Sequence, residues 1–145
     1  SLRIEKGYRH WGHDMADEDT PIEAGLGFAV CFGKREFLGR EVLLEQKRYG
    51  IKKRMVQFAL EDPKALLYHN EPIWRDDEIA GFITSGMFGH TTGAAIGLGY
   101  VNHADDVSAE YIESGLYEVE VAGQRIPARA SLRPFYDPTG ERIRG

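Results

Sequence analysis

The chain has 145 residues, of which 42% are hydrophobic, and its formal net charge at neutral pH is −5. This composition supports a packed core and argues against an intrinsically disordered chain. The negative balance and the mixed signs along the chain argue against a dedicated nucleic-acid binder.

The cysteine content and the hydropathy of the chain indicate which kind of cellular compartment suits it. The single cysteine, Cys31, excludes an internal disulfide and suits a reducing compartment. The sequence has no apolar run of about 18 residues and no signal-peptide pattern, so we expect neither a membrane span nor export. The first residues lack an initiator Met and lie within a charged, helix-like pattern. We therefore expect the chain to be a fragment of a longer protein.

The first twenty-five residues predict short elements separated by turns. Ser1–Lys6 reads as the last turns of a helix, and Gly7 is suited to end it in the left-handed conformation. Thr20 and Pro21 predict the start of another short helix, with Thr20 as the N-cap.

Two further elements are expected before the middle of the chain. Leu26–Phe32 is apolar on both faces and predicts a buried strand, in which Cys31 would be inert core. Arg40–Tyr49 carries apolar residues at helical spacing and predicts an amphipathic helix that Gly50 ends.

An acidic loop, His13–Asp19, follows an aromatic segment and raises the question of a metal site. His10, His13 and Asp14 have a spacing that can hold a metal, but no Cys partner or helical HExxH accompanies them. The loop also lacks the glycine and distal glutamate of a calcium loop. We therefore favour loop hydrogen bonds and capping for these side chains, and expect no metal.

From Ile51 onward the hydrophobic period changes to two. About six short strands separated by turn signals are typical of a small antiparallel barrel or jelly-roll-like sheet. The expected strands are 51–60, 72–75, 79–85, 94–101, 117–121 and 124–132. We predict an α+β chain: a small α/β remnant of an adjoining domain at residues 1–49, then a six-stranded antiparallel β-barrel domain at residues 50–145.

Six glycines between Gly81 and Gly99 mark the central hairpin of this second unit. Glycines within strands allow close backbone approach and predict a tightly curved sheet. A bulge or a turn with positive φ is expected at Met87–Phe88. The hairpin is either purely structural, or its tip carries Ser85, His90 and Thr91 toward a neighbouring domain or a ligand.

Common catalytic motifs are absent from the sequence. There is no GxSxG nucleophile elbow and no GxxxxGK[ST] phosphate-binding loop. Gly97-Leu98-Gly99 follows strand residues but opens no helix, so it does not fit a dinucleotide-binding fingerprint. Composition and spacing alone therefore lead only to an α/β segment followed by a β-barrel.

Three stretches carry a more specific signature and keep their order along the chain. The first contains Leu2-Arg3-Ile4-Glu5, Gly7, Trp11-Gly12, the acidic loop, Thr20-Pro21, Glu23-Ala24 and Leu26; the second is Phe37–Leu43 and the third Gly81–Val101. Together they resemble the aminomethyltransferase family. This family comprises glycine-cleavage T-proteins and the folate-binding C-terminal regions of dimethylglycine and sarcosine dehydrogenases.

The resemblance implies a fold and a reaction. Family members bind tetrahydrofolate in the central cavity of a three-domain ring and transfer a one-carbon unit to it from an amine. The reactive Asp, a pterin-binding Glu and an Arg of the family have no counterpart here, so we expect no catalytic residue in this chain and no activity from it alone.

The resemblance also implies partners and a location. The expected partners are the preceding N-terminal domains of the same polypeptide and, as a candidate, a lipoyl carrier protein. If the parent protein is a dehydrogenase, an upstream domain would bind FAD. The expected location is the cytoplasm, or the mitochondrial matrix in a eukaryote. The alternatives are a non-catalytic structural or interaction barrel on the same fold, and a related demethylase.

Three residues of the first signature are candidates for the folate pocket. Trp11 matches the family's pocket aromatic, and a flat pterin stacks favourably on an indole. Glu5 and Arg3 belong to the same signature, but helix packing and an ion pair are the favoured explanation for both.

Four further candidates come from the barrel. Ser85, His90 and Thr91 lie on the hairpin that would face the cavity. Arg133, or alternatively Arg142, is a candidate partner for a carboxylate of the folate tail, because the guanidinium fork matches a carboxylate.

Overall fold

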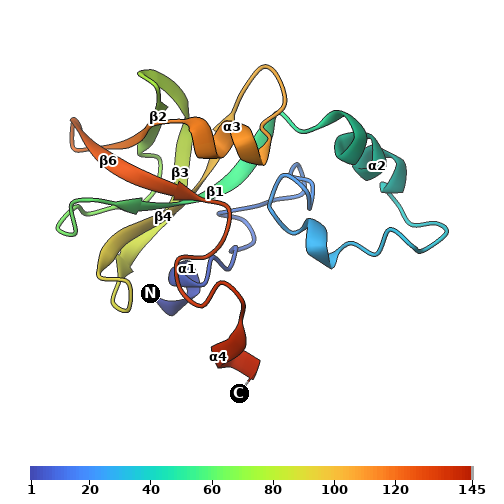
Figure 1. The fold of residues 1–145 in the computed structure, drawn as a ribbon, viewed down its shortest axis with the longest axis horizontal. Coiled ribbons are helices and arrows are strands. Elements are labelled where there is room, and N and C mark those ends of the chain that lie inside the picture. Colours follow the sequence, from blue (N-terminus) through green and yellow to red (C-terminus); the bar gives the residue numbers. More distant parts are fainter. Residues whose placement is uncertain (145) are drawn as a thin grey trace.

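The computed structural model describes residues 1–144, and its main body is a closed barrel of six antiparallel strands (Figure 1). The strands neighbour one another in the order β1-β4-β3-β2-β5-β6, and β6 pairs with β1 to close the barrel. Their bounds are β1 Lys53–Leu60, β2 Pro72–Arg75, β3 Glu78–Gly89, β4 Ala94–Asn102, β5 Tyr117–Val121 and β6 Gln124–Ser131. The expected six-stranded antiparallel barrel is confirmed.

The hydrophobic core has two parts that share strand β1. Inward-facing side chains fill the barrel; they include Val56, Phe58, Leu60, Ile73, Ile83, Val101 and Val119. A second cluster lies outside the barrel wall and contains Ile4, Met55, Ala59, Ile96 and Leu98. Residues 55–60 of β1 are all buried, because one face lines the barrel interior and the other lies under the N-terminal segment. Burial of a side chain such as that of Ile4 contributes about 1.5–3 kcal/mol.

Short helices decorate the barrel: α1 Leu2–Glu5, the 3-10 turn η1 Gly27–Ala29, α2 Arg40–Tyr49, α3 Ala109–Ser114 and α4 Glu141–Arg144. In Figure 1 the segment that carries α2 extends to one side of the barrel, whereas α1, α4 and both chain ends lie together on another side. Helix α2 ends at Gly50, whose amide donates to the carbonyl of Gln46 at 2.9 Å, as expected from the sequence. Within residues 1–144, every helix is too short or too polar to cross a bilayer.

The predicted strand at Leu26–Phe32 is wrong. The segment contains only the turn η1 and irregular backbone; Phe28 is 86% exposed, and Cys31 is exposed rather than inert core. Gly25 has a φ of +70°, so the chain turns where a strand would have to begin. Because the six strands close into a barrel, each already has a neighbouring strand on both sides, and Leu26–Phe32 pairs with none of them.

The central hairpin is longer than expected, and its irregularity lies elsewhere. Strand β3 continues regularly through Met87–Phe88. The bulge lies between Ile83 and Ser85, and the positive φ of +68° belongs to Gly93 in the turn. The prediction of a bulge or turn at Met87–Phe88 is therefore wrong. A bulge before Ser85 changes the direction in which the following side chains point.

Candidate functional site

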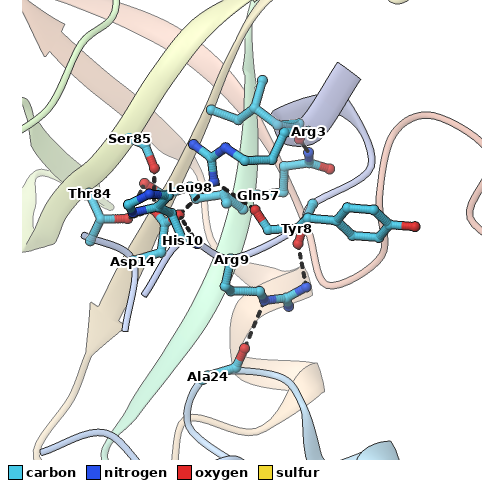
Figure 2. Close-up of polar contacts among 12 residues, drawn as sticks. Arg3, Tyr8, Arg9, His10, Asp14, Ala24, Gln57, Thr84, Ser85 and Leu98 are labelled. Atoms are coloured by element: carbon cyan, nitrogen blue, oxygen red, sulfur yellow. Dashed lines mark hydrogen bonds and ion pairs between the residues drawn. The ribbon is translucent and has the colours of Figure 1, made fainter. Parts of the chain in front are cut away.

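Asp14 is the centre of the polar contacts that attach the N-terminal segment to the barrel (Figure 2). Its carboxylate is 1% exposed. One oxygen accepts hydrogen bonds from the Arg3 guanidinium and the His10 amide, each at 2.8 Å. The other accepts from the hydroxyl groups of Thr84, at 2.6 Å, and Ser85. The bulge in β3 helps to place the two hydroxyls on the same carboxylate oxygen.

These donors decide the charge state of Asp14. Burial alone raises the pKa of the carboxyl, but the hydrogen bonds from Ser85, Thr84, His10 and Arg3 outweigh it and hold the pKa below its ordinary value. The group is therefore ionised at neutral pH. With all its hydrogen-bonding capacity used inside the protein, it serves as an anchor rather than as a proton donor.

Glu5 forms a second anchor at the tip of the β3–β4 hairpin. Its side chain is fully buried, and Oε1 accepts hydrogen bonds from the backbone amides of Thr91 and Thr92, each at 2.8 Å. The other oxygen, Oε2, is buried and has no hydrogen-bond partner within residues 1–144. Helix α1 thus holds the turn of the hairpin in place through a carboxylate.

Gln57 of β1 forms a third anchor beneath α1. Its side-chain amide donates to the carbonyl of Ile4, and its oxygen accepts from the amide of Phe135 at 2.8 Å. One buried amide therefore joins α1, the barrel wall and the C-terminal tail.

Trp11 begins the tight turn that contains Asp14. Trp11 and Met15 form an isolated β-bridge, and the amide of Gly12 donates to the carbonyl of Met15 at 2.8 Å. Gly12 has a φ of +87°, a conformation that favours glycine. The indole is 64% exposed. The turn thus holds a large aromatic ring at the surface.

The two histidines of the same turn lie close together. The rings of His10 and His13 lie 4.9 Å apart, and both residues are exposed. Residues 1–144 contain no group of three or more His, Cys, Asp or Glu side chains placed to hold a metal ion. Asp14 accepts a hydrogen bond from the backbone amide of His10, in agreement with the expected loop hydrogen bonds.

A hollow of about 360 Å³ lies beside the turn and is lined in part by Phe82, Tyr100, Lys53 and Asp19. Lys53 and Asp19 form an ion pair at 2.6 Å. Burial lowers the pKa of Lys53, but its hydrogen bond to Asp19 and the neighbouring carboxylates outweigh this effect, and the net shift is upward. Burial, followed by the charge of Asp19, raises the pKa of Tyr100, so its phenol stays neutral.

Some of the predicted site residues hold the N-terminal segment against the barrel, and the others are exposed. Arg3 and Ser85 meet at Asp14, and Glu5 meets the backbone of Thr91. These four residues lie at one junction, where α1 and the N-terminal turn contact the hairpin.

Besides Trp11, two predicted residues take no part in these hydrogen bonds. His90 is exposed in the hairpin turn, where its ring packs edge-on against Phe88 at a centroid distance of 5.2 Å. Arg133 is exposed and lines a separate groove, to which Trp11 does not contribute.

Sequence reasoning missed Asp14, Thr84 and Gln57 as organisers of this junction. Asp14 stands among other carboxylates in the acidic loop, and nothing local distinguishes it from them. Its hydroxyl partners are 70 and 71 residues away. The available signal was Arg3, a cation in the short helix α1 that needs a counter-charge.

Two family models match the chain. The glycine cleavage T-protein C-terminal barrel domain matches residues 53–137, and the GCVT N-terminal domain matches residues 1–34. The chain belongs to the aminomethyltransferase family. The resemblance seen in the sequence is therefore confirmed.

Curated relatives match over nearly the whole chain. The 4-methylaminobutanoate oxidase (formaldehyde-forming) of Paenarthrobacter nicotinovorans is 42% identical over 146 residues, and human mitochondrial sarcosine dehydrogenase is 39% identical over 149 residues. Both alignments cover 100% of this chain but only 17% and 16% of the relatives. The aminomethyltransferase of Synechocystis sp. is 41% identical, with 94% of this chain and 35% of that protein covered.

A solved structure of an aminomethyltransferase superposes on this chain. The glycine cleavage system aminomethyltransferase T of Bartonella henselae superposes with a TM-score of 0.78 at 26% identity. The match covers 94% of this chain and 37% of that one. The chain thus spans between about a sixth and a third of the lengths of these relatives.

Proposed function

We propose that this chain is the C-terminal part of a tetrahydrofolate-dependent enzyme that transfers a one-carbon unit from an amine to folate. The amine would be of the glycine, sarcosine or dimethylglycine type. The preceding domains of the same polypeptide would supply the reactive groups, and a lipoyl carrier protein or an FAD domain would complete particular members. Residues 1–49 would finish the folate-binding domain, and residues 50–145 would form the barrel domain.

The observation that carries this proposal is the similarity, over 94–100% of this chain, to parts of proteins named for amine chemistry. An aminomethyltransferase, a sarcosine dehydrogenase and a methylaminobutanoate oxidase are each about 40% identical to this chain. Their names share amine chemistry, although their lengths differ. A shared C-terminal part would fit a shared step, the handling of the carbon unit removed from the amine.

The residues present fit one wall of a folate site. An exposed indole on a fixed turn, with Phe82 and Tyr100 lining the adjacent hollow, offers aromatic surface to a flat ring. Folate, when bound, would accept the one-carbon unit. Within this chain, Asp14 and Glu5 would keep the turn and the hairpin tip in position, while Trp11 would contact the ring.

Calorimetric titration of the complete polypeptide with tetrahydrofolate tests the proposal. Replacement W11A should weaken binding about fivefold, since stacking contributes about 1 kcal/mol, and W11F should retain most of the affinity. Y49A is the matched control, because Tyr49 is 72% exposed on α2, away from the turn. Absence of binding heat at millimolar ligand would contradict the proposal.

A second candidate function follows from another relative. The mitochondrial pyruvate dehydrogenase phosphatase regulatory subunit of Mus musculus is 38% identical over 92% of this chain, and its name describes regulation rather than catalysis. A non-catalytic interaction barrel on the same fold would bind a protein partner and give no heat with tetrahydrofolate.

A third candidate is a related demethylase. One relative is named as a formaldehyde-forming oxidase, which releases the carbon unit instead of transferring it. Product analysis of the complete polypeptide separates the two outcomes: free formaldehyde in the presence of folate would favour the demethylase.

A further inference from the structure

A groove of about 530 Å³ lies between helix α3, with the segment that follows it, and strands β5 and β6. Mouths of β-barrels are frequent binding sites, and the volume is within the usual range for them. None of its lining residues belongs to the Asp14 junction or to the hollow beside the Trp11 turn. In Figure 1, α3 lies well away from α1 and from both chain ends. The groove is therefore a surface separate from the proposed folate wall.

The floor of the groove is apolar. Ile112 of α3 and Tyr117 of β5 belong to the barrel core, and Ala128 and Ala130 of β6 pack against this core. Leu116 lines the groove as well, yet its side chain is 80% exposed. An apolar side chain of a ligand that enters the groove would remove this surface from water, which favours binding.

Leu116 is held in its exposed position by hydrogen bonds of its own backbone. Its amide donates to the carboxylate of Asp76 at 2.9 Å, and its carbonyl accepts from the amide of Asp76 at 3.0 Å. Both polar groups of the Leu116 backbone are thus fixed by one residue. Binding to a preorganised contact of this kind costs less conformational entropy than binding to a free loop.

The rim of the groove is acidic. Five carboxylates and one cation line it: Glu61, Asp76, Asp77, Glu113, Glu118 and Arg129. Arg75 and Arg125 pair with three of the carboxylates. Within residues 1–144, Glu61 and Glu113 form no ion pair, and both are exposed. The rim therefore complements a positively charged ligand and repels nucleic acid.

Tyr117 adds a polar group without a partner. The residue is 6% exposed, and its hydroxyl is buried with no hydrogen-bond partner within residues 1–144. Arg75, its neighbour in the β2–β5 register, donates instead to Asp76 and to the last turn of α3. A buried hydroxyl left unpaired is costly, so a donor that enters the groove and reaches it gains a hydrogen bond.

We propose that this groove docks a basic segment of a partner protein, in which an apolar side chain is flanked by lysine or arginine. The apolar side chain packs on Ile112 and Leu116, and the flanking cations meet Glu61 and Glu113 at the rim. A small amine would satisfy the carboxylates but would leave Leu116 in water. A protein segment covers both, and this favours it as the occupant.

Calorimetric titration of the complete polypeptide with capped peptides tests the proposal at low ionic strength. The probes are acetyl-Lys-Arg-Leu-Lys-amide, the same peptide with serine in place of leucine, its counterpart with glutamate in place of the basic residues, and spermidine. We expect the leucine peptide to bind about fivefold more tightly than the serine peptide, and the acidic peptide not to bind. Spermidine, of similar charge, should bind more weakly; binding as tight as that of the leucine peptide would assign the groove to small amines and overturn the proposal.

Neutral variants of the rim locate the charged contacts. E61Q/E113Q should weaken binding of the leucine peptide about tenfold without changing the thermal midpoint, because both residues are exposed. E36Q/E45Q is the matched control: it neutralises the same number of exposed carboxylates at positions that do not line the groove. Equal effects of the two double variants would show that only the overall charge of the chain matters.

A second pair of variants locates the apolar contact. L116S should abolish the preference for the leucine peptide over the serine peptide, and it leaves the backbone hydrogen bonds of the turn in place. L66S is the control, since Leu66 is 69% exposed and lies outside the groove, and it should keep the preference. An unchanged preference in L116S, or no binding heat at millimolar leucine peptide, would overturn the proposal.

Discussion

Asp14 shows how a single ionised side chain can organise a junction between distant parts of a chain. Its two oxygens accept hydrogen bonds from a helix, a turn and a β-strand. A buried charge of this kind adds little net stability compared with an apolar replacement of the same shape, but its removal leaves several buried donors without partners. Its value is therefore positional: it fixes the turn that exposes Trp11.

Replacement of Asp14 by alanine should lower the free energy of unfolding by about 3 kcal/mol, because Arg3, Thr84 and Ser85 lose their common acceptor. Urea denaturation followed by circular dichroism measures the change. D17A is the control, since Asp17 is exposed in the same loop, and it should change stability by less than about 0.5 kcal/mol. Equal stability of D14A and wild type would show that Asp14 is not an anchor.

The same carboxylate should make stability depend on pH in acid. The pKa of Asp14 in the folded state lies below its ordinary value of 3.8. Its contribution is therefore complete above that value and is lost as the pH falls through the lower folded pKa. The pKa of Asp137 is also lowered, through its hydrogen bond to Lys6, but Asp137 is present in both wild type and D14N.

The difference between wild type and D14N consequently isolates Asp14. We expect the gap in unfolding free energy to be widest above pH 3.8 and to narrow as the solution becomes more acidic. Urea titrations at a series of pH values measure it. A gap that stays constant across this range would contradict the assigned shift.

At the scale of elements, the β3–β4 hairpin depends on glycines where the backbones approach closely. A Cβ at Gly99 would lie 2.6 Å from the carbonyl oxygen of Phe82 and 3.1 Å from the Cα of Ile83. A Cβ at Gly81 would collide with the carbonyl oxygen of Tyr100. Because these neighbours are backbone atoms within a ladder, they cannot move aside without breaking strand pairing.

G99A should therefore lower the free energy of unfolding by at least about 2 kcal/mol, as expected for overpacking against fixed atoms. Gly33 offers a matched control: a Cβ there meets open space, and its φ is not positive. G33A should be neutral or slightly stabilising. Thermal unfolding of the two variants measures the contrast, and similar midpoints would mean that the barrel adjusts to the added methyl group.

The elements differ in how well the sequence predicts them, for a physical reason. Period-two alternation with turn residues identifies the six barrel strands, because inward and outward positions alternate regardless of the partner strand. Leu26–Phe32 has the same apolar character but no partner strand, since each of the six barrel strands already has two neighbours. Whether an apolar run becomes a strand is decided by pairing, which is a property of the whole fold.

The junction was less predictable than the barrel. The sequence signature identified Arg3, Glu5 and Ser85, but not the contacts that Arg3 and Ser85 share through Asp14. Such contacts depend on the register of β3 and on the bulge before Ser85, and neither is visible in local sequence. Residue type can nominate members of a polar site, whereas their grouping requires the long-range topology.

At the scale of the whole molecule, the N-terminal segment packs into the hydrophobic cluster on the outer wall of the barrel and is not a loose appendage. Ile4 is 2% exposed and packs with Met55 and Leu98 on the outer wall of the barrel. Gln57 reaches from β1 to the carbonyl of Ile4 and the amide of Phe135. Apolar burial and buried hydrogen bonds thus join the first residues, the barrel and the tail, so they should unfold together.

The two tryptophans allow this cooperativity to be tested directly. Trp11 reports on the N-terminal turn and Trp74 on strand β2, so the variants W74F and W11F each leave one reporter. Circular dichroism first measures how far each substitution itself shifts the urea midpoint of unfolding. After this correction, the fluorescence anisotropy of the remaining tryptophan should fall with the same midpoint in both variants. A lower midpoint for Trp11 alone would show that the N-terminal segment detaches before the barrel opens. In that case Asp14, Glu5 and Gln57 would be local clamps, and the exposed indole would be held in place only while they remain closed.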